Sequence, residues 1–163
     1  MRLVALAGII AMAACAASAD QAKDGSVQVT PGRYSWKQET SIVGIPINED
    51  NIECLIPEKA TITLSKLATD LEKGCSVDNV VPTADGYSFD LICRGKTKGK
   101  AKATLAHTAK SMSIRAKGSA KFMGMDAGFS MKADAKYLGE CSAEETANAT
   151  ESWKRENQQA NGG

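Results

Sequence analysis

The cysteines of this sequence could form disulfides, bind a metal or carry out redox chemistry. Four of the five cysteines lie in the central part of the chain: Cys54, Cys75, Cys93 and Cys141. There is no Cys-x-x-Cys motif and no Cys/His pair at the spacing of metal ligands, so neither a redox motif nor a zinc site is indicated. An even number of cysteines in an exported chain is typical of structural disulfides. We expect two of them, in one of three connectivities.

The other residues form no catalytic constellation. His107 is the only histidine, and it lacks an acidic orienter or nucleophile; the chain has neither a Gly-x-Ser-x-Gly motif nor a phosphate-binding glycine loop. Met123, Met125 and Met131 could offer soft sulfur ligands to Cu(I). Because Met131 is expected to face the core, core and turn filling is the favoured interpretation of these methionines. We therefore expect a protein that is not an enzyme and has no cofactor and no metal site.

The N-terminus has the layout of a secretory signal peptide. Arg2 precedes an apolar run over residues 3–17, and Ala17-Ser18-Ala19 supplies the small residues that signal peptidase requires. Cleavage after Ala19 would release a periplasmic protein. The alternative is a lipobox at residues 12–15, in which Cys15 would be lipidated. Met12 is a weak fit to that motif, so simple secretion is favoured.

Charge is unevenly distributed along a chain whose formal net charge is +1. Residues 20–93 carry 6 basic and 12 acidic side chains, whereas residues 94–136 carry 11 basic and 2 acidic ones. Within each expected strand the basic residues occupy alternate positions, which places them on the outer face of adjacent strands. Five of them are the candidate ligand-binding residues: Lys98, Lys100, Lys102, Arg115 and Lys117. A solvated face is the simpler interpretation, and an anionic envelope component is the functional one. Nucleic acid is disfavoured because no aromatic residue is interleaved with the lysines.

These basic residues belong to a segment in which inward-facing and outward-facing residue types alternate. The alternation extends over residues 75–137, which predicts a five-stranded antiparallel meander. Loops of five, three, four and four residues set the cross-strand neighbours. The expected pairs include Cys75 with Cys93, Val81 with Tyr87, Phe89 with Ala101, Leu105 with Ile114 and Gly118 with Met131. Two further strands precede the meander, one following Pro31 and a short one around residues 52–56.

Strand direction bears on the cysteine pairing. Residues 57–71 have helical spacing, with a possible break at the β-branched residues 61–63. If this helix carries the chain from one end of the sheet to the other, Cys75 and Cys93 share one end, and Cys54 and Cys141 share the other. Parity thus favours Cys75–Cys93 and Cys54–Cys141, and it lets the first strand pair with the last. A Cys54–Cys75 bond is the main alternative.

The inner face of the predicted sheet is unusually poor in large side chains. Its central residues are Gly99, Ala101, Ala103, Ala116, Gly118 and Ala120. A closely packed helix is the favoured explanation, and a ligand cavity or strong coiling of the sheet are the alternatives. The expected fold is mainly β: a curled antiparallel sheet or partly closed barrel of about seven strands, with one covering helix and a polar C-terminal helix.

The expected boundaries follow from these elements. Residues 1–19 form the signal peptide, residues 20–30 a flexible leader, and residues 31–141 the disulfide-bonded β domain. Residues 142–163 form a polar helix with a disordered tail, and Ser142 and Glu145 make a capping box at its start.

Several short motifs are spread over nearly all of the expected folded part. They are Pro31-Gly32-Arg33-Tyr34, Cys54-Leu55-Ile56-Pro57-Glu58, Gly74-Cys75, Leu91-Ile92-Cys93 and Leu138-Gly139-Glu140-Cys141. With these residues the chain resembles domain of unknown function 3617, a family of exported bacterial proteins. Tyr34 stands where that family often has Trp. The resemblance implies export and a small disulfide-bonded domain, and it implies no particular activity.

We therefore expect a non-enzymatic periplasmic binding or envelope-associated module. The alternative is a carrier of a lipid or other apolar ligand in a half-open β-barrel. The corresponding partners are an anionic envelope component or an apolar ligand. No nucleic acid and no transmembrane span in the mature chain are expected.

Overall fold

The computed structural model describes residues 25–71, 73–95, 98–122 and 124–161. The predicted signal peptide, its cleavage site at Ala19 and the alternative lipid attachment at Cys15 lie outside these residues, as do Lys96 and Met123. None of the helices in the described ranges is both long enough and apolar enough to cross a bilayer.

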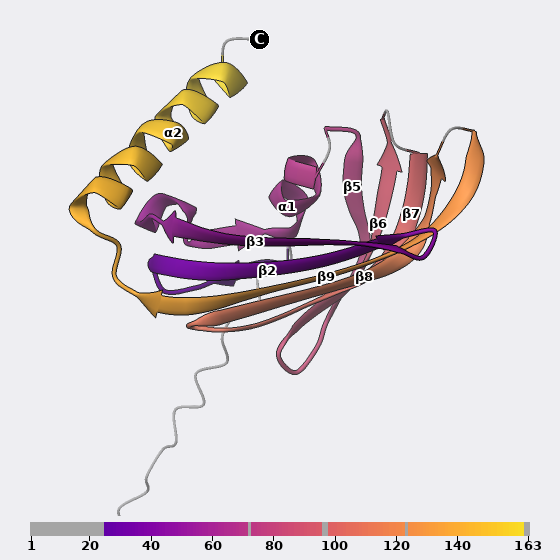
Figure 1. Ribbon diagram of the computed structural model, residues 1–163, viewed down its shortest axis with the longest axis horizontal. Coiled ribbons are helices and arrows are strands. Elements are labelled where there is room, and N and C mark those ends of the chain that lie inside the picture. Colours follow the sequence, from indigo (N-terminus) through magenta and orange to yellow (C-terminus); the bar gives the residue numbers. More distant parts are fainter. Residues whose placement is uncertain (1–24, 72, 96–97, 123, 162–163) are drawn as a thin grey trace, which may run out of the picture.

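Most of the described chain forms one seven-stranded antiparallel sheet (Figure 1). The strands are β2 (Gly32–Ile42), β3 (Ile45–Leu55), β5 (Cys75–Pro82), β6 (Gly86–Arg94), β7 (Lys98–Thr108), β8 (Ser111–Phe122) and β9 (Met125–Gly139). Their order across the sheet is β3-β2-β9-β8-β7-β6-β5. The predicted meander and the pairing of the first strand with the last are both confirmed.

The sheet is open, and the expectation of a curled sheet or partly closed barrel was wrong. Closing a barrel would require β3 to pair with β5, but these strands form the two edges. Residues 56–71 of the chain between them instead cross the inner face of the sheet, where Leu64 and Ala68 are almost fully buried. The connection thus covers part of the inner face, and neither edge strand gains a second neighbour within the described sheet.

The predicted faces of the strands are correct except near the end of β5, and the register differs at two turns. Observed partners are Cys75 with Cys93, Leu105 with Ile114, Phe89 with Ala103, and Gly118 with Phe129. The first two pairs match the prediction, and the last two are displaced by two residues. The cause lies in the turns, where Arg94 pairs with Lys98 and Phe122 with Met125. A shift of two residues keeps each side chain on its original face.

The segment that covers the inner face is divided into three short elements. They are the 3-10 helix η1 (Pro57–Lys59), strand β4 (Thr61–Thr63) and helix α1 (Leu64–Leu71). The break at the β-branched residues confirms the division that the sequence suggested. Strand β4 pairs with β1 (Ser26–Gln28), and Val27 and Val29 are buried. Residues 25–30 are therefore part of the fold, which corrects their assignment to a flexible leader.

Helix α1 packs on the small residues of the inner face. Leu64 and Ala68 belong to the same buried cluster as Ala101, Ala103 and Ala116, so close packing accounts for the small side chains at these three positions. A cavity of about 140 Å³ remains between α1 and the sheet, with apolar walls that include Phe89. This volume is well below the roughly 300 Å³ at which pockets for drug-sized ligands begin.

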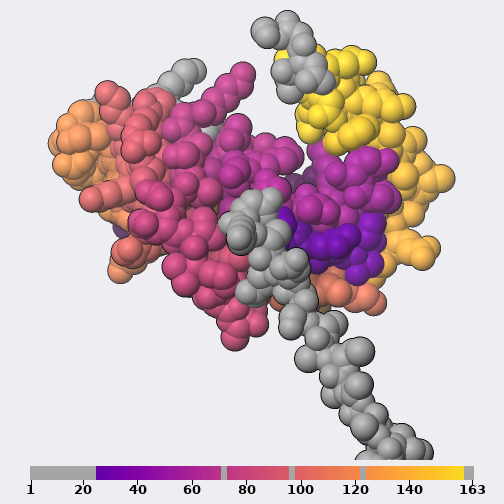
Figure 2. Space-filling view, turned by 180° about the vertical axis from the view of Figure 1, so that it is seen from behind, coloured from indigo at the N-terminus to yellow at the C-terminus, as the bar shows by residue number. Residues whose placement is uncertain are grey.

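Helix α2 (Ala143–Asn161) follows the sheet and forms ion pairs with β2 and η1. Arg33 pairs with Glu145 at 3.2 Å, and Lys59 pairs with Glu156 at 3.0 Å. Figure 2 shows this helix standing away from the body of the domain, with a hollow between them; a groove of about 320 Å³ there is lined by side chains that include Trp153.

The start of α2 confirms the predicted capping box. The Ser142 backbone N–H donates to Glu145 Oε2 at 2.7 Å, and the Glu145 N–H donates to Ser142 Oγ at 3.1 Å. The hydrogen bond from the Ser142 backbone holds the pKa of the Glu145 carboxyl below its usual value. Because α2 continues to Asn161, most of the expected disordered tail is helical, and the last two residues lie outside the described chain.

The structure contains the two disulfides that strand parity favoured. Cys75 and Cys93 are directly opposed on β5 and β6, with their Cα atoms 3.9 Å apart. Cys54 and Cys141 join the end of β3 to the residues before α2, with a Cα separation of 5.7 Å. The alternative Cys54–Cys75 bond is therefore ruled out.

Candidate functional site

The outer face of β7, β8 and β9 carries the candidate ligand-binding residues. Lys98, Lys100 and Lys102 alternate along β7, while Arg115 and Lys117 have the same orientation on β8. In the β7–β8 register Lys102 lies opposite Lys117, and Arg115 lies opposite Thr104. The structure therefore brings the predicted residues together on adjacent strands. Lys132 on β9, which shares their parity, lies opposite Arg115.

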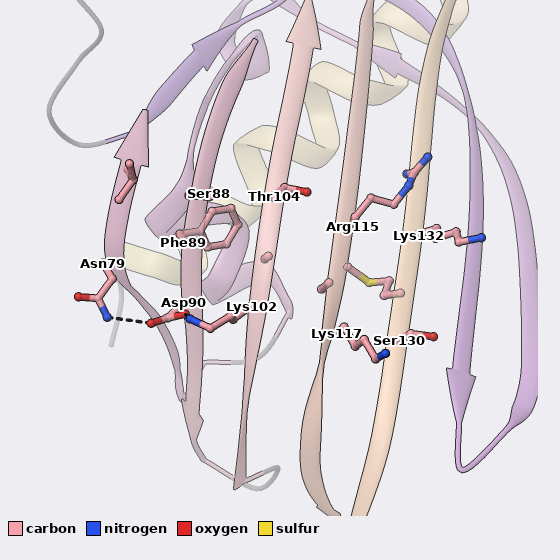
Figure 3. Close-up of a pocket in the computed structure, with 14 residues that line it drawn as sticks. Asn79, Ser88, Phe89, Asp90, Lys102, Thr104, Arg115, Lys117, Ser130 and Lys132 are labelled. Carbon is pink, nitrogen blue, oxygen red and sulfur yellow. Dashed lines mark hydrogen bonds and ion pairs between the residues drawn. The ribbon is translucent and has the colours of Figure 1, made fainter. Parts of the chain in front are cut away.

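A shallow groove of about 720 Å³ lies on the outer face, and its lining includes Lys102, Arg115, Lys117 and Lys132 (Figure 3). Two cross-strand rows define its polar wall. One row contains Asp90, Lys102, Lys117 and Ser130, from β6 to β9. The next contains Ser88, Thr104, Arg115 and Lys132. Lys98 and Lys100 extend the positive charge along β7 beyond this groove.

Three of the cations in or beside the groove already have carboxylate partners. Lys102 Nζ lies 3.1 Å from Asp90 Oδ1. The Arg115 guanidinium donates to both oxygens of Asp134, at 2.8 and 3.0 Å. Lys132 Nζ is 3.6 Å from Glu39 Oε2. Apart from the half-buried Asp90, these groups are substantially exposed, so the contribution of the ion pairs to stability is small.

A bulge in the edge strand β5 supplies a further polar contact. The register shifts between Asp78 and Val81, and Asn79 has a positive φ of 50°. Asn79 Nδ2 donates to Asp90 Oδ2 at 2.7 Å. This hydrogen bond, followed by that from Lys102, holds the pKa of the Asp90 carboxyl below its usual value. The bulge also turns Val81 outward, which corrects its predicted inward pairing with Tyr87.

Lys117 differs from its neighbours because positive groups surround it. Lys102 lies opposite it on β7, Arg115 precedes it on the same face of β8, and Lys132 lies on the diagonal on β9. Within the described ranges, no carboxylate forms an ion pair with Lys117. Like charges directly opposed across two strands destabilise a sheet. An anion held at Lys117 would remove this repulsion.

The groove also contains residues that sequence reasoning did not place in the site. Asp90 and Asn79 were not recognised because their contact depends on the bulge in β5. Ser130 enters the row of Lys117 through the β8–β9 pairing. Lys132 could have been identified from the sequence, since it occupies an outward-facing position like the five chosen residues. Its position beside Arg115, however, depends on the register at the β8–β9 turn.

The other candidate chemical groups do not form a comparable site. His107 lies opposite Met112, and its Nδ1 is buried without a hydrogen-bond partner. Met125 is 69% exposed at the start of β9, whereas Met131 packs against the core. Among the described side chains, no group of three His, Cys, Asp or Glu residues could hold a metal ion.

The comparisons with known proteins give one match. The family described as "Protein of unknown function (DUF3617)" matches residues 29–141, which include β2 to β9 and both disulfides. No curated protein and no solved structure matches the chain.

Proposed function

The chain belongs to the DUF3617 family of proteins of unknown function, and from its geometry we propose that it is a non-enzymatic module that binds anionic groups on the outer face of its sheet. Its two disulfides indicate an oxidising compartment outside the cytoplasm. The partner in such a compartment is an envelope component that bears phosphate or carboxylate groups.

The periplasm is the compartment that we propose. The N-terminal sequence supports it, because Arg2, the apolar run and Ala17-Ser18-Ala19 have the order of a cleaved signal peptide. The simplest mature protein begins at Asp20 and carries no lipid. The N-terminal residue of the protein purified from cells tests this proposal.

The environment of Lys117 is the observation that supports anion binding. Its ammonium group is exposed and surrounded by Lys102, Arg115 and Lys132. Lys102 and Arg115 keep their own carboxylates, so the positive charge available to a ligand is concentrated at Lys117 and extends toward Lys100. Ser130 lies opposite Lys117, where its hydroxyl can donate a hydrogen bond to an anion.

The arrangement suits binding better than catalysis. A general acid or base needs a pKa near the working pH, and Asp90, the carboxyl in the groove, has a lowered pKa because Asn79 and Lys102 hydrogen bond to its charged form. The groove is also shallow and exposed, so water would surround a bound group. Several lysines on a flat strand surface favour an extended anion with repeated charges.

Removing the charge of Lys117 tests the proposal. Inorganic polyphosphate is titrated into the mature protein at low salt, and binding is measured by calorimetry. We expect Lys117→Gln to weaken binding about fivefold, the typical effect of one lysine near an anionic surface. The folded state should tolerate the change, because Lys117 is exposed and has only like charges beside it.

Lys154→Gln is the matched control. Lys154 is an exposed residue of α2, and the substitution removes the same net charge from a different surface. Polyphosphate should bind this variant almost as well as the wild type. Equal weakening in both variants would show that only net charge matters, and would refute a site at Lys117.

A further inference from the structure

The turn between β2 and β3 has a residue that its backbone geometry does not favour. Val43 and Gly44 both have positive φ, at 52° and 80°, as in the two-residue hairpin turns that prefer Asn-Gly. A β-branched residue is rarely found in this region because its side chain crowds the backbone. Val43 is also 67% exposed, so burial does not compensate for the strain. Neither local conformation nor core packing explains the valine.

Other apolar side chains are exposed beside this turn. Ile45 and Ile47 on β3 are 67% and 46% exposed, and Met125 at the start of β9 is 69% exposed. The Val43 N–H donates to the carbonyl of Gly128 at 3.0 Å, so the β2–β3 and β8–β9 hairpins lie side by side at one end of the sheet (Figure 1). We refer to Val43, Ile45, Ile47 and Met125 as the apolar tip.

The apolar tip projects into open space. A Cβ atom added to Gly44 or Gly124, which lie in the two turns, would meet no atom within 4 Å. Exposed apolar residues are common when they are scattered singly, but a group on adjacent protruding turns marks an interaction surface.

Positive charge lies at the same end of the sheet. Strand β7 begins at this end, so Lys98 and Lys100 lie at the tip end of the outer face. Lys121, on β8, is paired with Asp126 at 3.1 Å, whereas within the described residues no carboxylate forms an ion pair with Lys98 or Lys100. Apolar side chains and lysines at the same end of the sheet match the two layers of a lipid surface, which has acyl chains beneath anionic headgroups.

We propose that the apolar tip inserts into the surface of a bilayer that contains anionic lipids, while Lys98 and Lys100 contact the headgroups. The inference rests on the proposed anion binding and names a lipid surface as the source of the anions. A soluble polyanion would make no use of Val43, Ile45 and Met125. A second copy of the chain docked at this end would bring like charges together.

Vesicle binding of tip variants tests this inference. Mature wild-type protein and Val43→Asn are sedimented with vesicles of phosphatidylglycerol and phosphatidylcholine. We expect V43N to bind these vesicles about tenfold more weakly, since one apolar side chain no longer enters the bilayer. Thermal unfolding should show that V43N is at least as stable as the wild type, because Asn tolerates positive φ better than Val. Met125→Gln, at an exposed position, should weaken vesicle binding in the same direction.

The controls separate this inference from anion binding itself. Ile52→Asn makes a similar apolar-to-polar change at an exposed position on β3, seven residues from Ile45, and should leave vesicle binding unchanged. Both tip variants should bind polyphosphate like the wild type. Wild-type vesicle binding by V43N and M125Q would overturn membrane insertion and leave the Lys117 site standing. A loss of polyphosphate binding in V43N would also overturn the inference, because the tip would then act indirectly.

Discussion

The Cys54–Cys141 disulfide should stabilise this protein more than Cys75–Cys93 does, because it closes the longer loop. The two bonds span sequence separations of 87 and 18 residues. The chain entropy that they remove from the unfolded state corresponds to about 4.5 kcal/mol for the longer loop and about 3 kcal/mol for the shorter one. Since small domains have a total stability of about 5–15 kcal/mol, the loss of either bond should be readily measurable.

Single substitutions isolate each bond with little disturbance of the core. Cys141→Ala and Cys93→Ala each remove one disulfide and leave the partner as a thiol, so the buried Cys75 side chain stays in place. Urea unfolding is followed at mildly acidic pH, where protonated thiols exchange slowly, and intact mass after alkylation verifies the remaining bond. We expect C141A to lose about 1.5 kcal/mol more free energy of unfolding than C93A. An equal loss, or a larger one in C93A, would refute the loop-length argument.

Two further predictions concern export and the outer groove. The intact mass of protein purified from the cell envelope fraction should correspond to a chain that begins at Asp20 without lipid, whereas a diacylglyceryl group on Cys15 would establish the lipoprotein alternative. Asn79→Ala should raise the pKa of the Asp90 carboxyl toward its usual value, as measured by NMR titration, because the hydrogen bond that chiefly lowers it is lost. A carboxyl group whose pKa is lower in the folded state than in the unfolded state stabilises the fold at pH values above the unfolded pKa. This stabilisation is lost as the pH falls through the folded pKa, so the acid-dependent loss of stability should be smaller in N79A. An unchanged Asp90 pKa would contradict the role assigned to Asn79.

The faces of the strands were predictable because alternation is a local property. Lys102 and Lys117 were assigned to the outer face from parity alone, and the structure places both there. The exact neighbours at two turns were not predictable, since pairing Phe89 with Ala101 or with Ala103 gives the same inward face. The bulge at Asn79 was missed for a different reason: it inserts one extra residue into an edge strand without interrupting the sequence pattern.

The candidate site was only partly predictable because its charge balance is non-local. The excess of basic residues in the segment 94–136 was evident, but among the described residues two of the four carboxylates that pair with them come from other parts of the chain. Glu39 reaches Lys132 through the β2–β9 pairing, and Asp90 reaches Lys102 through the β6–β7 pairing. That Lys117 remains among cations follows only once these partners are placed.

The sequence by itself determined the strand faces, the polar C-terminal helix with its capping box and, through strand parity, the favoured cysteine pairing. Each of these follows from a local pattern: a period of two, a Ser-x-x-Glu motif, or cysteines at the ends of neighbouring strands. Only the tertiary structure decided that the sheet stays open and that α1 packs on part of its inner face. It also decided that the exposed apolar residues of two hairpins meet at one end. These outcomes depend on contacts between segments far apart in the chain, and a local sequence pattern does not specify the free energies of such contacts.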